Sequence, residues 1–218
     1  MDSRCMELAG LQMNRTQIAA LLALAVIVWG LWLLFAGVPV GMEHLAPFSG
    51  TVSVVVLIMA GFNKWFWKWK IFHGWLVVRP VFTGTWKAEL VSNYVLPETG
   101  VKIPPIPAYL VVRQTYLNVS VRLFSAETSS RLLAGQLQQS DDGEWVFYGV
   151  YWDTPRVAVR DRSQIHHGAV ELRLGGADQI SQLEGHYWTD RGTMGDIHAR
   201  SCVDALCSSF DDARRVCP

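Results

Sequence analysis

The residues best suited to chemistry lie in a short loop near the end of the chain. Arg191 stands there between Thr189 and Thr193. A guanidinium group is a permanent cation whose rigid fork of N–H donors matches phosphate oxygens, and the two hydroxyls could add further hydrogen bonds. This spacing predicts a phosphate-binding loop. The alternative is an arginine that is merely solvated at a turn.

Aromatic side chains could supply the other half of a nucleotide site. Trp86, Tyr148, Tyr151 and Tyr187 carry flat rings, and any base can stack on such a surface. Rings in a β-domain usually fill the core, which is the alternative for each of them. Taken singly, each of these residues is therefore better explained as structural.

No motif in the sequence is typical of an enzyme. A GxSxG elbow, a Walker loop and HExxH are all absent, and no pair of carboxylates is isolated in an apolar segment. Glu184, His186, Asp196 and His198 invite a metal hypothesis. These side chains would spread along two strands instead of converging on one point, so charge pairing explains them better. We predict a non-enzyme without catalytic residues, cofactor or metal.

The candidate loop is predicted to join two paired strands. Asp190-Arg191-Gly192 offers a glycine for the left-handed position of a three-residue turn. Pairing Thr189 with Thr193 then fixes the register behind the turn. One face would carry Tyr187 opposite Gly195, Gly185 opposite Ile197 and Leu183 opposite Ala199, which suits a core. The other face would carry His186 opposite Asp196, Glu184 opposite His198 and Gln182 opposite Arg200, which suits solvent.

Beyond Gly74 the sequence predicts consecutive β-strands. Short stretches rich in Val, Thr, Tyr and Trp are separated there by Gly, Pro, Ser and Asp. About 120 residues of strands must close or stack to protect their edges, which favours an up-and-down barrel over an open sandwich. The predicted strands are Thr83–Val91, Ala108–Phe124 (bent or split near Arg113 to Thr115), Ser130–Gln139, Glu144–Trp152, Gly168–Leu174, Ile180–Thr189 and Thr193–Arg200, with Arg156–Val159 as a short eighth strand.

Two apolar segments precede the β-rich part. Residues 18–37 carry no charge, and as a helix they match the roughly 30 Å hydrocarbon core of a bilayer. Residues 45–62 are shorter and contain Gly50 and Gly61, so a buried or re-entrant helix is the alternative. Residues 63–70 alternate Trp and Lys as an interfacial anchor does, which favours a second span.

The distribution of Lys and Arg predicts the orientation of these spans. Arg4 and Arg15 precede the first span, three lysines follow the second, and the connecting loop 38–44 contains neither residue type. Basic residues favour the cytoplasmic side of a membrane. The N-terminus and the β-rich domain are therefore expected in the cytoplasm, with a short outer hairpin.

The charge balance argues against a protein that binds long nucleic acid, and the cysteine pattern argues against a disulfide-bonded or zinc-binding protein. The 19 basic and 19 acidic side chains cancel, so no positive field is available to bind long nucleic acid by counterion release. Cys5, Cys202, Cys207 and Cys217 form no CxxC pair and are expected to be reduced thiols, not a disulfide frame or a zinc site. Residues 202–218 are expected to form a tail with a short amphipathic helix.

A series of motifs, in order and behind two apolar segments, resembles a known family. The motifs are Gly84-Thr85-Trp86, Gln114 and Tyr116, Ser125 to Ser130, Tyr148-x-x-Tyr151-x-Asp153-x-Pro155, His167-Gly168, and Gly185-x-Tyr187-x-Thr189-Asp190-Arg191-x-Thr193-x-Gly195. From Ile18 to Arg200 the chain is similar to the two-transmembrane, β-strand-rich effectors of bacterial cyclic-oligonucleotide antiphage signalling (CBASS). Members of that family join a membrane hairpin to a lipocalin-like barrel.

The resemblance implies that one chain both binds the signal molecule and disrupts the membrane. A cyclic dinucleotide, made by a synthase encoded beside the effector, would bind the barrel. The transmembrane helices would then form a homo-oligomer that breaches the lipid of the bacterial inner membrane and aborts infection. The alternative is a membrane-tethered, lipocalin-like carrier or sensor of an apolar small ligand. The candidate ligand-binding residues are Trp86, Gln114, Tyr148, Tyr151, Tyr187, Thr189, Arg191 and Thr193.

The expected organisation is a membrane-anchored all-β protein. Two N-terminal transmembrane helices precede an eight-stranded, lipocalin-like antiparallel barrel. The expected segments are a cytosolic tail (1–17), the first transmembrane helix (18–37), an outer loop (38–44), the second transmembrane helix (45–62), an interfacial aromatic and basic linker (63–79), the cytosolic barrel (80–201) and the C-terminal tail (202–218).

Overall fold

The structure is a computed structural model that describes residues 56–176 and 179–218, with isolated positions 23, 26–27, 30–31, 34–35, 37 and 53. The expected tail 1–17, outer loop 38–44 and most of both predicted spans lie outside the described residues. Within the described part, no helix has the length and apolar character needed to cross a membrane. The chain divides into two compact units, Met1–Val78 with Thr115–Leu117, and Arg79–Gln114 with Asn118–Pro218.

In the first unit, residues 56–64 are helical and are followed by two short 3-10 helices, η1 (Phe66–Lys68) and η2 (Lys70–Phe72). Trp67 is fully buried, whereas Trp65 and Trp69 are more than half exposed. Lys64 Nζ lies 4.5 Å from the centroid of the Trp65 ring. This segment therefore presents indole rings and ammonium groups side by side at its surface.

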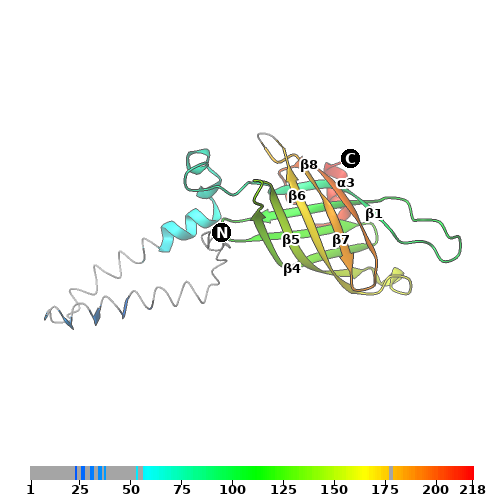
Figure 1. Cartoon of the computed structure of the whole chain (residues 1–218), viewed down its shortest axis with the longest axis horizontal. Coiled ribbons are helices and arrows are strands. Elements are labelled where there is room, and N and C mark those ends of the chain that lie inside the picture. Colours follow the sequence, from blue (N-terminus) through cyan, green and yellow to red (C-terminus); the bar gives the residue numbers. More distant parts are fainter. Residues whose placement is uncertain are drawn as a thin grey trace. The chain divides into compact units, whose positions relative to one another are not determined.

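In the described part of the second unit, eight strands form one closed antiparallel barrel (Figure 1). Each strand pairs with its neighbours in the chain, and the first pairs with the last. The predicted eight-stranded antiparallel barrel is confirmed. The strands are β1 (Gly84–Ser92), β2 (Ile106–Gln114), β3 (Val119–Ser125), β4 (Thr128–Gln139), β5 (Trp145–Pro155), β6 (His166–Gly175), β7 (Gln182–Thr189) and β8 (Met194–Val203).

One prediction about the strands is confirmed in its split form and another is wrong. The segment Ala108–Phe124 is split after Gln114 into two strands, β2 and β3, which pair with each other. Arg156–Val159 is not a strand, because Val157–Val159 form the 3-10 helix η3. A strand there would have needed a free edge, and β5 is already paired with β4 on one side and with β6 on the other. Splitting Ala108–Phe124 supplies the eighth strand.

Large apolar side chains fill one end of the barrel. Trp86, Phe147, Leu172 and Leu183 are at most 2% exposed and belong to a single cluster. Trp86 Nε1 donates a hydrogen bond to the carbonyl oxygen of Phe82 at 3.1 Å, so its polar atom is satisfied inside the core. This end, where β1 begins and β8 ends, is a packed floor.

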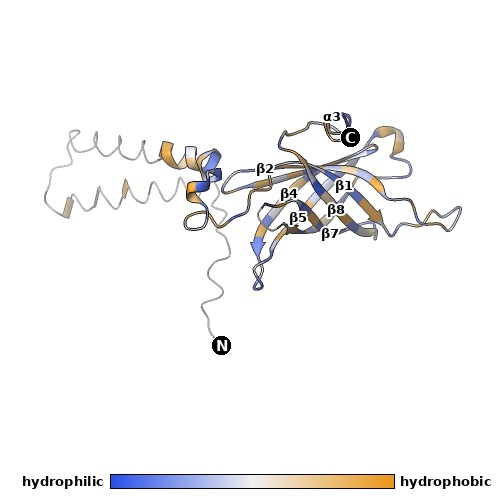
Figure 2. Ribbon diagram, turned by 90° about the horizontal axis from the view of Figure 1, so that it is seen from above, coloured by the Kyte–Doolittle hydropathy of each residue, from blue (hydrophilic) through white to orange (hydrophobic). Residues whose placement is uncertain are grey.

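The C-terminal tail folds against the outside of the barrel. Helix α3 (Phe210–Val216) starts at Ser209, whose side chain accepts a hydrogen bond from the Asp212 amide. Figure 2 shows α3 and the C-terminus lying together outside the wall, and α3 contacts β2. The expected short helix is confirmed.

The expectation of reduced thiols is wrong for two of the cysteines. Cys202 and Cys217 form a disulfide, whereas Cys207 is free and buried. Folding of the tail brings the Cα atoms of Cys202 and Cys217 to 6.0 Å, within the usual range for a disulfide. Linear spacing could not show this proximity, because it depends on how the tail returns to the end of β8.

Candidate ligand-binding site

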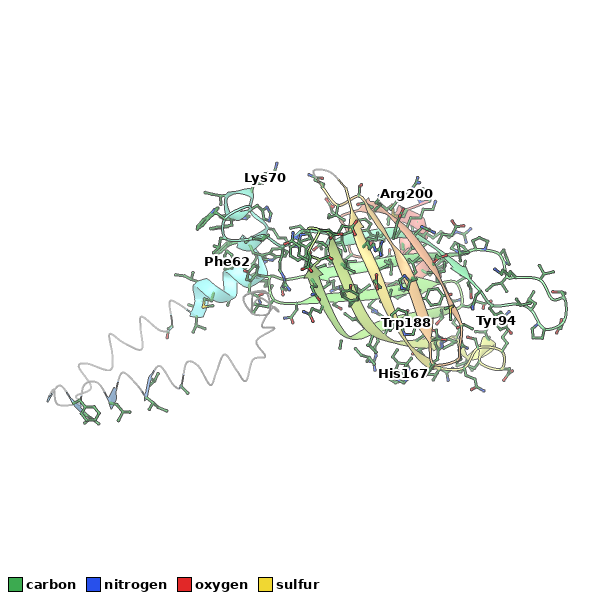
Figure 3. All side chains as sticks on the ribbon, viewed as in Figure 1. Phe62, Lys70, Tyr94, His167, Trp188 and Arg200 are labelled. Atoms are coloured by element: carbon green, nitrogen blue, oxygen red, sulfur yellow. A yellow bond between two sulfur atoms is a disulfide. The ribbon has the colours of Figure 1, made fainter. Side chains whose placement is uncertain are left out.

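The other end of the barrel, here called the mouth, is bounded by loops 93–105, 126–127, 156–165 and 190–193. Figure 3 labels Tyr94, His167 and Trp188 at this end. Along each strand, residues two apart share a face, so the side chains that continue the inner rows of the floor point into the mouth. The strand register identifies which side chains these are.

Buried polar side chains replace the apolar core near the mouth. Ser92, Ser125, Ser130, Asp153 and His166 are all buried. Asp153 Oδ2 accepts a hydrogen bond from Thr128 Oγ1, and His166 Nδ1 lies 3.8 Å from the same carboxylate oxygen. The barrel therefore changes from an apolar floor to a polar mouth, which suits a ligand with many hydrogen-bonding groups.

The turn between β7 and β8 has the predicted geometry. Gly192 adopts a positive φ of 77°, and the Thr189 amide donates to the Thr193 carbonyl oxygen at 2.9 Å. The two threonine Oγ1 atoms lie 2.7 Å apart. Arg191 Nη1 donates to Ser163 Oγ at 3.2 Å, which holds the exposed guanidinium beside the loop 156–165. A cation and two hydroxyls are thus gathered on one side of the mouth.

The predicted register of this hairpin is also confirmed. Tyr187 pairs with Gly195, Gly185 with Ile197 and Leu183 with Ala199, while the polar pairs form on the other face as expected. Leu183, Ile197 and Ala199 are buried in the main core cluster, and Tyr187 packs against it. Tyr187 is therefore the inward-facing ring nearest the turn.

Tyr151 joins Tyr187 on the inner face. Burial raises the pKa of Tyr151 well above its ordinary value of 10, and the charges of Asp153 and Tyr187 raise it further, while Arg191 acts in the opposite direction. The phenol therefore stays protonated at neutral pH and can donate a hydrogen bond. The strand register places Tyr151 level with the β7–β8 turn, because Tyr151 pairs with Gly168 and Gly168 pairs with Thr189.

A groove of about 540 Å³ opens at the rim of the mouth. It lies where the ends of β1 and β7 and the start of β8 meet the β1–β2 loop. Ser92, Tyr187 and Gly195 line it from the inner face of the sheet, and Trp188 lines it from the outer face, with Lys102 from the loop. This volume lies within the range of about 300–1,000 Å³ typical of small-molecule sites.

The structure brings five of the eight predicted ligand-binding residues together. They are Tyr151, Tyr187, Thr189, Arg191 and Thr193, all at the mouth. Their grouping follows from the meander, which places the end of β5 and the β7–β8 turn at the same end of the barrel.

The other three predicted residues lie elsewhere. Trp86 belongs to the floor. Gln114 lies at the same end, where its side chain accepts from the Phe82 amide at 3.2 Å and donates to the Pro80 carbonyl oxygen at 2.9 Å. Tyr148 is 42% exposed on the outer face, because its position alternates with that of buried Phe147. In this structure, Trp86 and Gln114 serve packing and loop attachment.

The polar face of the β7–β8 hairpin behaves as a solvated ladder. Glu184, His186, Asp196 and His198 are exposed, and His186 Nε2 lies 3.9 Å from Glu171 Oε2 on β6. Across the described residues, no group of three or more His, Cys, Asp or Glu side chains is placed to hold a metal ion.

Sequence reasoning missed several residues at the mouth. Trp188 and Lys102 line the groove, and Asp153 with His166 forms the buried polar pair. Trp188 faces outward because it alternates with Tyr187 on β7, so a search for inward-facing residues did not include it. Lys102 lies in a loop whose path the sequence does not reveal. Asp153 and His166 could have been suspected from their even spacing with Tyr151 and Val170 on the inner face.

A closed antiparallel barrel with a packed floor and a polar, grooved mouth is the architecture of a receptor for a small ligand. Comparison with known proteins agrees with this class. The chain belongs to the Cap15 family, since residues 77–201 match the model of its cyclic dinucleotide receptor domain. The chain is also similar to CD-NTase-associated protein 15 of Staphylococcus schleiferi, at 27% identity over 152 residues, 70% of this chain and 77% of that protein.

Proposed function

We propose that this chain is an effector of CBASS antiphage signalling that is switched on when a cyclic dinucleotide binds at the mouth of its barrel. The observation that carries the proposal is the match of residues 77–201 to a cyclic dinucleotide receptor domain. The gathering of Tyr151, Tyr187 and Arg191 at a polar mouth supplies chemistry suited to that ligand.

In the proposed complex, Arg191 binds a phosphate of the ligand, and the hydroxyl of the Thr189–Thr193 pair that is not the donor within the pair donates a further hydrogen bond. Charge-assisted hydrogen bonds of this kind are about twice as strong as neutral ones. A base stacks on Tyr187 or on the half-exposed ring of Trp188, both of which line the groove. Lys102 offers a second cation for the other phosphate across the groove.

The polar mouth favours a nucleotide over an apolar cargo. An apolar carrier needs a cavity lined by apolar side chains, whereas Trp86, Phe147 and Leu183 already fill the floor of this barrel. Near the mouth the buried residues are Ser125, Asp153 and other polar groups. Ser125 and Asp153 already accept hydrogen bonds within the protein, and a polar ligand can use their remaining hydrogen-bonding capacity, whereas an apolar ligand cannot.

The response to the ligand is proposed to take place in the bacterial inner membrane. The apolar segments 18–37 and 45–62 anchor the chain there, with the barrel in the cytoplasm. The exposed rings of Trp65, Trp69 and Trp75 support this arrangement, because indole rings beside lysines favour the headgroup layer. Ligand binding drives the spans to assemble into a homo-oligomer that disrupts the bilayer.

Such a response requires only that the ligand bind the assembling state of the chain modestly more tightly than the resting state. A ligand shifts an equilibrium only by the difference between its affinities for the two states. Confinement of the chains to a membrane raises their effective concentration, so the assembling state needs less additional stabilisation. A cyclic dinucleotide released by a synthase in the same cell would provide the signal.

The proposal can be tested on the full chain in detergent micelles. Thermal unfolding is followed with a panel of cyclic di- and trinucleotides, and with linear dinucleotides as controls. A specific ligand at a hundred times its Kd adds about 2.7 kcal/mol of stability. We expect stabilisation by at least one cyclic dinucleotide and not by its linear counterpart. No stabilisation by any cyclic nucleotide, in a chain that unfolds cooperatively, would contradict the proposal.

The membrane step needs a separate assay. The chain is reconstituted in vesicles loaded with a fluorescent dye, and leakage is measured before and after the stabilising nucleotide is added. We expect ligand-dependent leakage, together with a larger cross-linked species on gel electrophoresis. Binding without leakage or assembly would retain the receptor and reject the proposed membrane disruption.

A further inference from the structure

Strand β2 is buried on both of its faces. Leu110 and Val112 belong to the cluster inside the barrel, whereas Tyr109 and Val111 belong to a second cluster with Phe124 of β3. Strands that are buried on both sides lose the usual alternation of apolar and polar residues. Tyr109, Val111 and Phe124 therefore form an apolar strip on the outside of the barrel wall, here called the outer strip.

The C-terminal tail covers this strip. Cys207, Ala213 and Cys217 are the tail residues buried in the second cluster, and Phe210 packs against it. Thr85 Oγ1 donates to the Ala205 carbonyl oxygen at 2.6 Å and accepts from the Cys207 amide at 3.2 Å. We call residues 204–218 the cover.

A short helix, its apolar contacts and two hydrogen bonds attach the last part of the cover to the wall. Helix α3 has seven residues, of which Ala213 is buried. Isolated helices shorter than about 12 residues are marginal in water. Two hydrogen bonds fix the end of the cover to the wall: the Tyr109 hydroxyl donates to the Cys217 carbonyl oxygen at 2.9 Å, and Lys87 Nζ donates to the Pro218 carbonyl oxygen at 2.5 Å. The disulfide adds a covalent link to these contacts.

The disulfide is placed where a reductant can reach it. It joins the end of the cover to β8 across 15 residues and so removes the open conformations of that segment. Cys202 is exposed on β8, whereas Cys217 is fully buried between the cover and the wall of the barrel. Thiol–disulfide exchange requires access to only one of the two sulfur atoms. Cys202 provides that access while the cover is still closed.

We propose that the Cys202–Cys217 disulfide is a redox latch. While the disulfide is intact the cover stays on the outer strip, and reduction releases the cover and exposes Tyr109, Val111 and Phe124 to water. This device concerns the wall of the barrel and not the mouth, and its two cysteines and the cover lie beyond the matched receptor domain, which ends at residue 201. The proposed latch can therefore be tested independently of nucleotide binding.

The reducing step balances with a dithiol as the reductant. A thiolate of the dithiol attacks the disulfide, and its second sulfur then displaces the remaining cysteine from the mixed disulfide. The bond between Cys202 and Cys217 breaks, and one S–S bond forms within the reductant. The two protons of the dithiol pass to the cysteines. Reoxidation by a disulfide compound of the same class reverses the step.

Cys207 is a built-in reporter of the cover. Its side chain is 5% exposed and its backbone amide is bonded to Thr85, so an alkylating reagent reaches it only when the cover lifts. The test uses the full chain in detergent carrying Cys5→Ser, and counts N-ethylmaleimide adducts by intact mass. We expect no adducts in the oxidised chain and three after treatment with dithiothreitol. One adduct after reduction, confined to Cys202, would overturn the proposal.

A variant tests release without a reductant. In Cys202→Ser/Cys217→Ser, alkylation of Cys207 should be at least about tenfold faster than in the oxidised parent, because local opening now controls access. Ser201→Ala, at the exposed neighbouring position, is the control and should match the parent. Trypsin cleavage after Arg214 and Arg215 should accelerate in parallel. Slow alkylation and unchanged cleavage in the double variant would show that the cover closes without the latch.

Discussion

The ring of Tyr187 lies against Gly195 on the neighbouring strand. A Cβ atom added to Gly195 would lie 2.9 Å from Tyr187 Cε1 and only 2.3 Å from the Val91 carbonyl oxygen. The absence of a side chain at position 195 therefore lets the ring and the β1 backbone approach each other at the rim. The same two residues line the groove.

This close approach predicts that Gly195→Ala is costly. The added methyl group meets the backbone of β1, which can move only by disturbing the seam between β1 and β8. Overpacking of this kind typically costs about 1–3 kcal/mol. Thermal unfolding should show the loss, whereas Asp196→Ala, at the next and exposed position, should stay within about 0.5 kcal/mol of wild type. Equal stability of the two variants would contradict the tight fit.

Arg191→Ala should weaken binding of a cyclic dinucleotide without unfolding the barrel. Hydrogen bonds to a charged group are worth about 1.5–3 kcal/mol, so Kd should rise roughly tenfold to a hundredfold. Isothermal titration with the stabilising nucleotide measures the change. Arg200→Ala removes another exposed arginine on β8 and is the matched control. An unchanged Kd for Arg191→Ala would remove Arg191 from the site.

Tyr187 should contribute to nucleotide binding through its aromatic ring and not through its hydroxyl group. Tyr187→Phe keeps the stacking surface and is expected to bind nearly as well as wild type. Tyr187→Ala should lose about 1–3 kcal/mol of binding energy, the usual worth of a base stacked on an aromatic side chain. Titrations of both variants separate the ring from the hydroxyl. Equal losses in the two variants would indicate that the hydroxyl, and not the ring, contacts the ligand.

The two tryptophans Trp86 and Trp188 should behave in opposite ways. Trp86 is 2% exposed in the floor, and truncating a buried aromatic to Ala typically costs about 3–5 kcal/mol. Trp188 is 46% exposed at the rim, so Trp188→Ala should leave stability nearly intact while weakening nucleotide binding. Chemical denaturation monitored by circular dichroism compares them. A stable Trp86→Ala variant would contradict the packing of the floor.

The β7–β8 turn should loosen in acid through Asp190. A hydrogen bond from the His167 amide lowers the pKa of Asp190 below its ordinary value of 3.8. The ionised form is therefore favoured in the folded chain. Its stabilising contribution is complete above about pH 4 and is lost as the pH falls through the folded-state pKa. Asp190→Asn cannot ionise, so it should lack this component of the acid sensitivity.

Denaturant midpoints measured between pH 2 and pH 6 test the effect of Asp190. The difference between wild type and Asp190→Asn should shrink as the pH falls. Asp161→Asn, at an exposed position of the β5–β6 loop, controls for the loss of one negative charge. A constant difference across the range would mean that Asp190 ionisation is not coupled to folding.

The hairpin that carries Arg191 could be predicted because its information is local. Gly192 fixes the turn, the turn fixes the register, and alternation then assigns Tyr187 and Leu183 to the inner face. The closed barrel followed from the number of strands and the need to protect their edges. These features are determined by residues close in sequence and by the number of strands, both of which can be read directly from the sequence.

The remaining features depend on contacts between distant segments. The sequence left open whether Ala108–Phe124 is one bent strand or two strands, because the cover makes the outer face of β2 as apolar as its inner face. The partnership of Cys202 with Cys217 requires the tail to return to β8. Tyr148 and Tyr151 differ in position by three residues and so face opposite sides of the sheet. Residue type alone could not separate them.

The cyclic pairing of the strands gives the barrel a single long-range junction. β1 and β8 are about a hundred residues apart in the chain, whereas every other pairing in the described barrel joins consecutive strands. Loop-closure entropy makes such a junction late to form during folding. A nascent chain that has not yet released β8 from the ribosome would expose two unpaired edges, so synthesis itself is the stage at which this protein is most prone to aggregate.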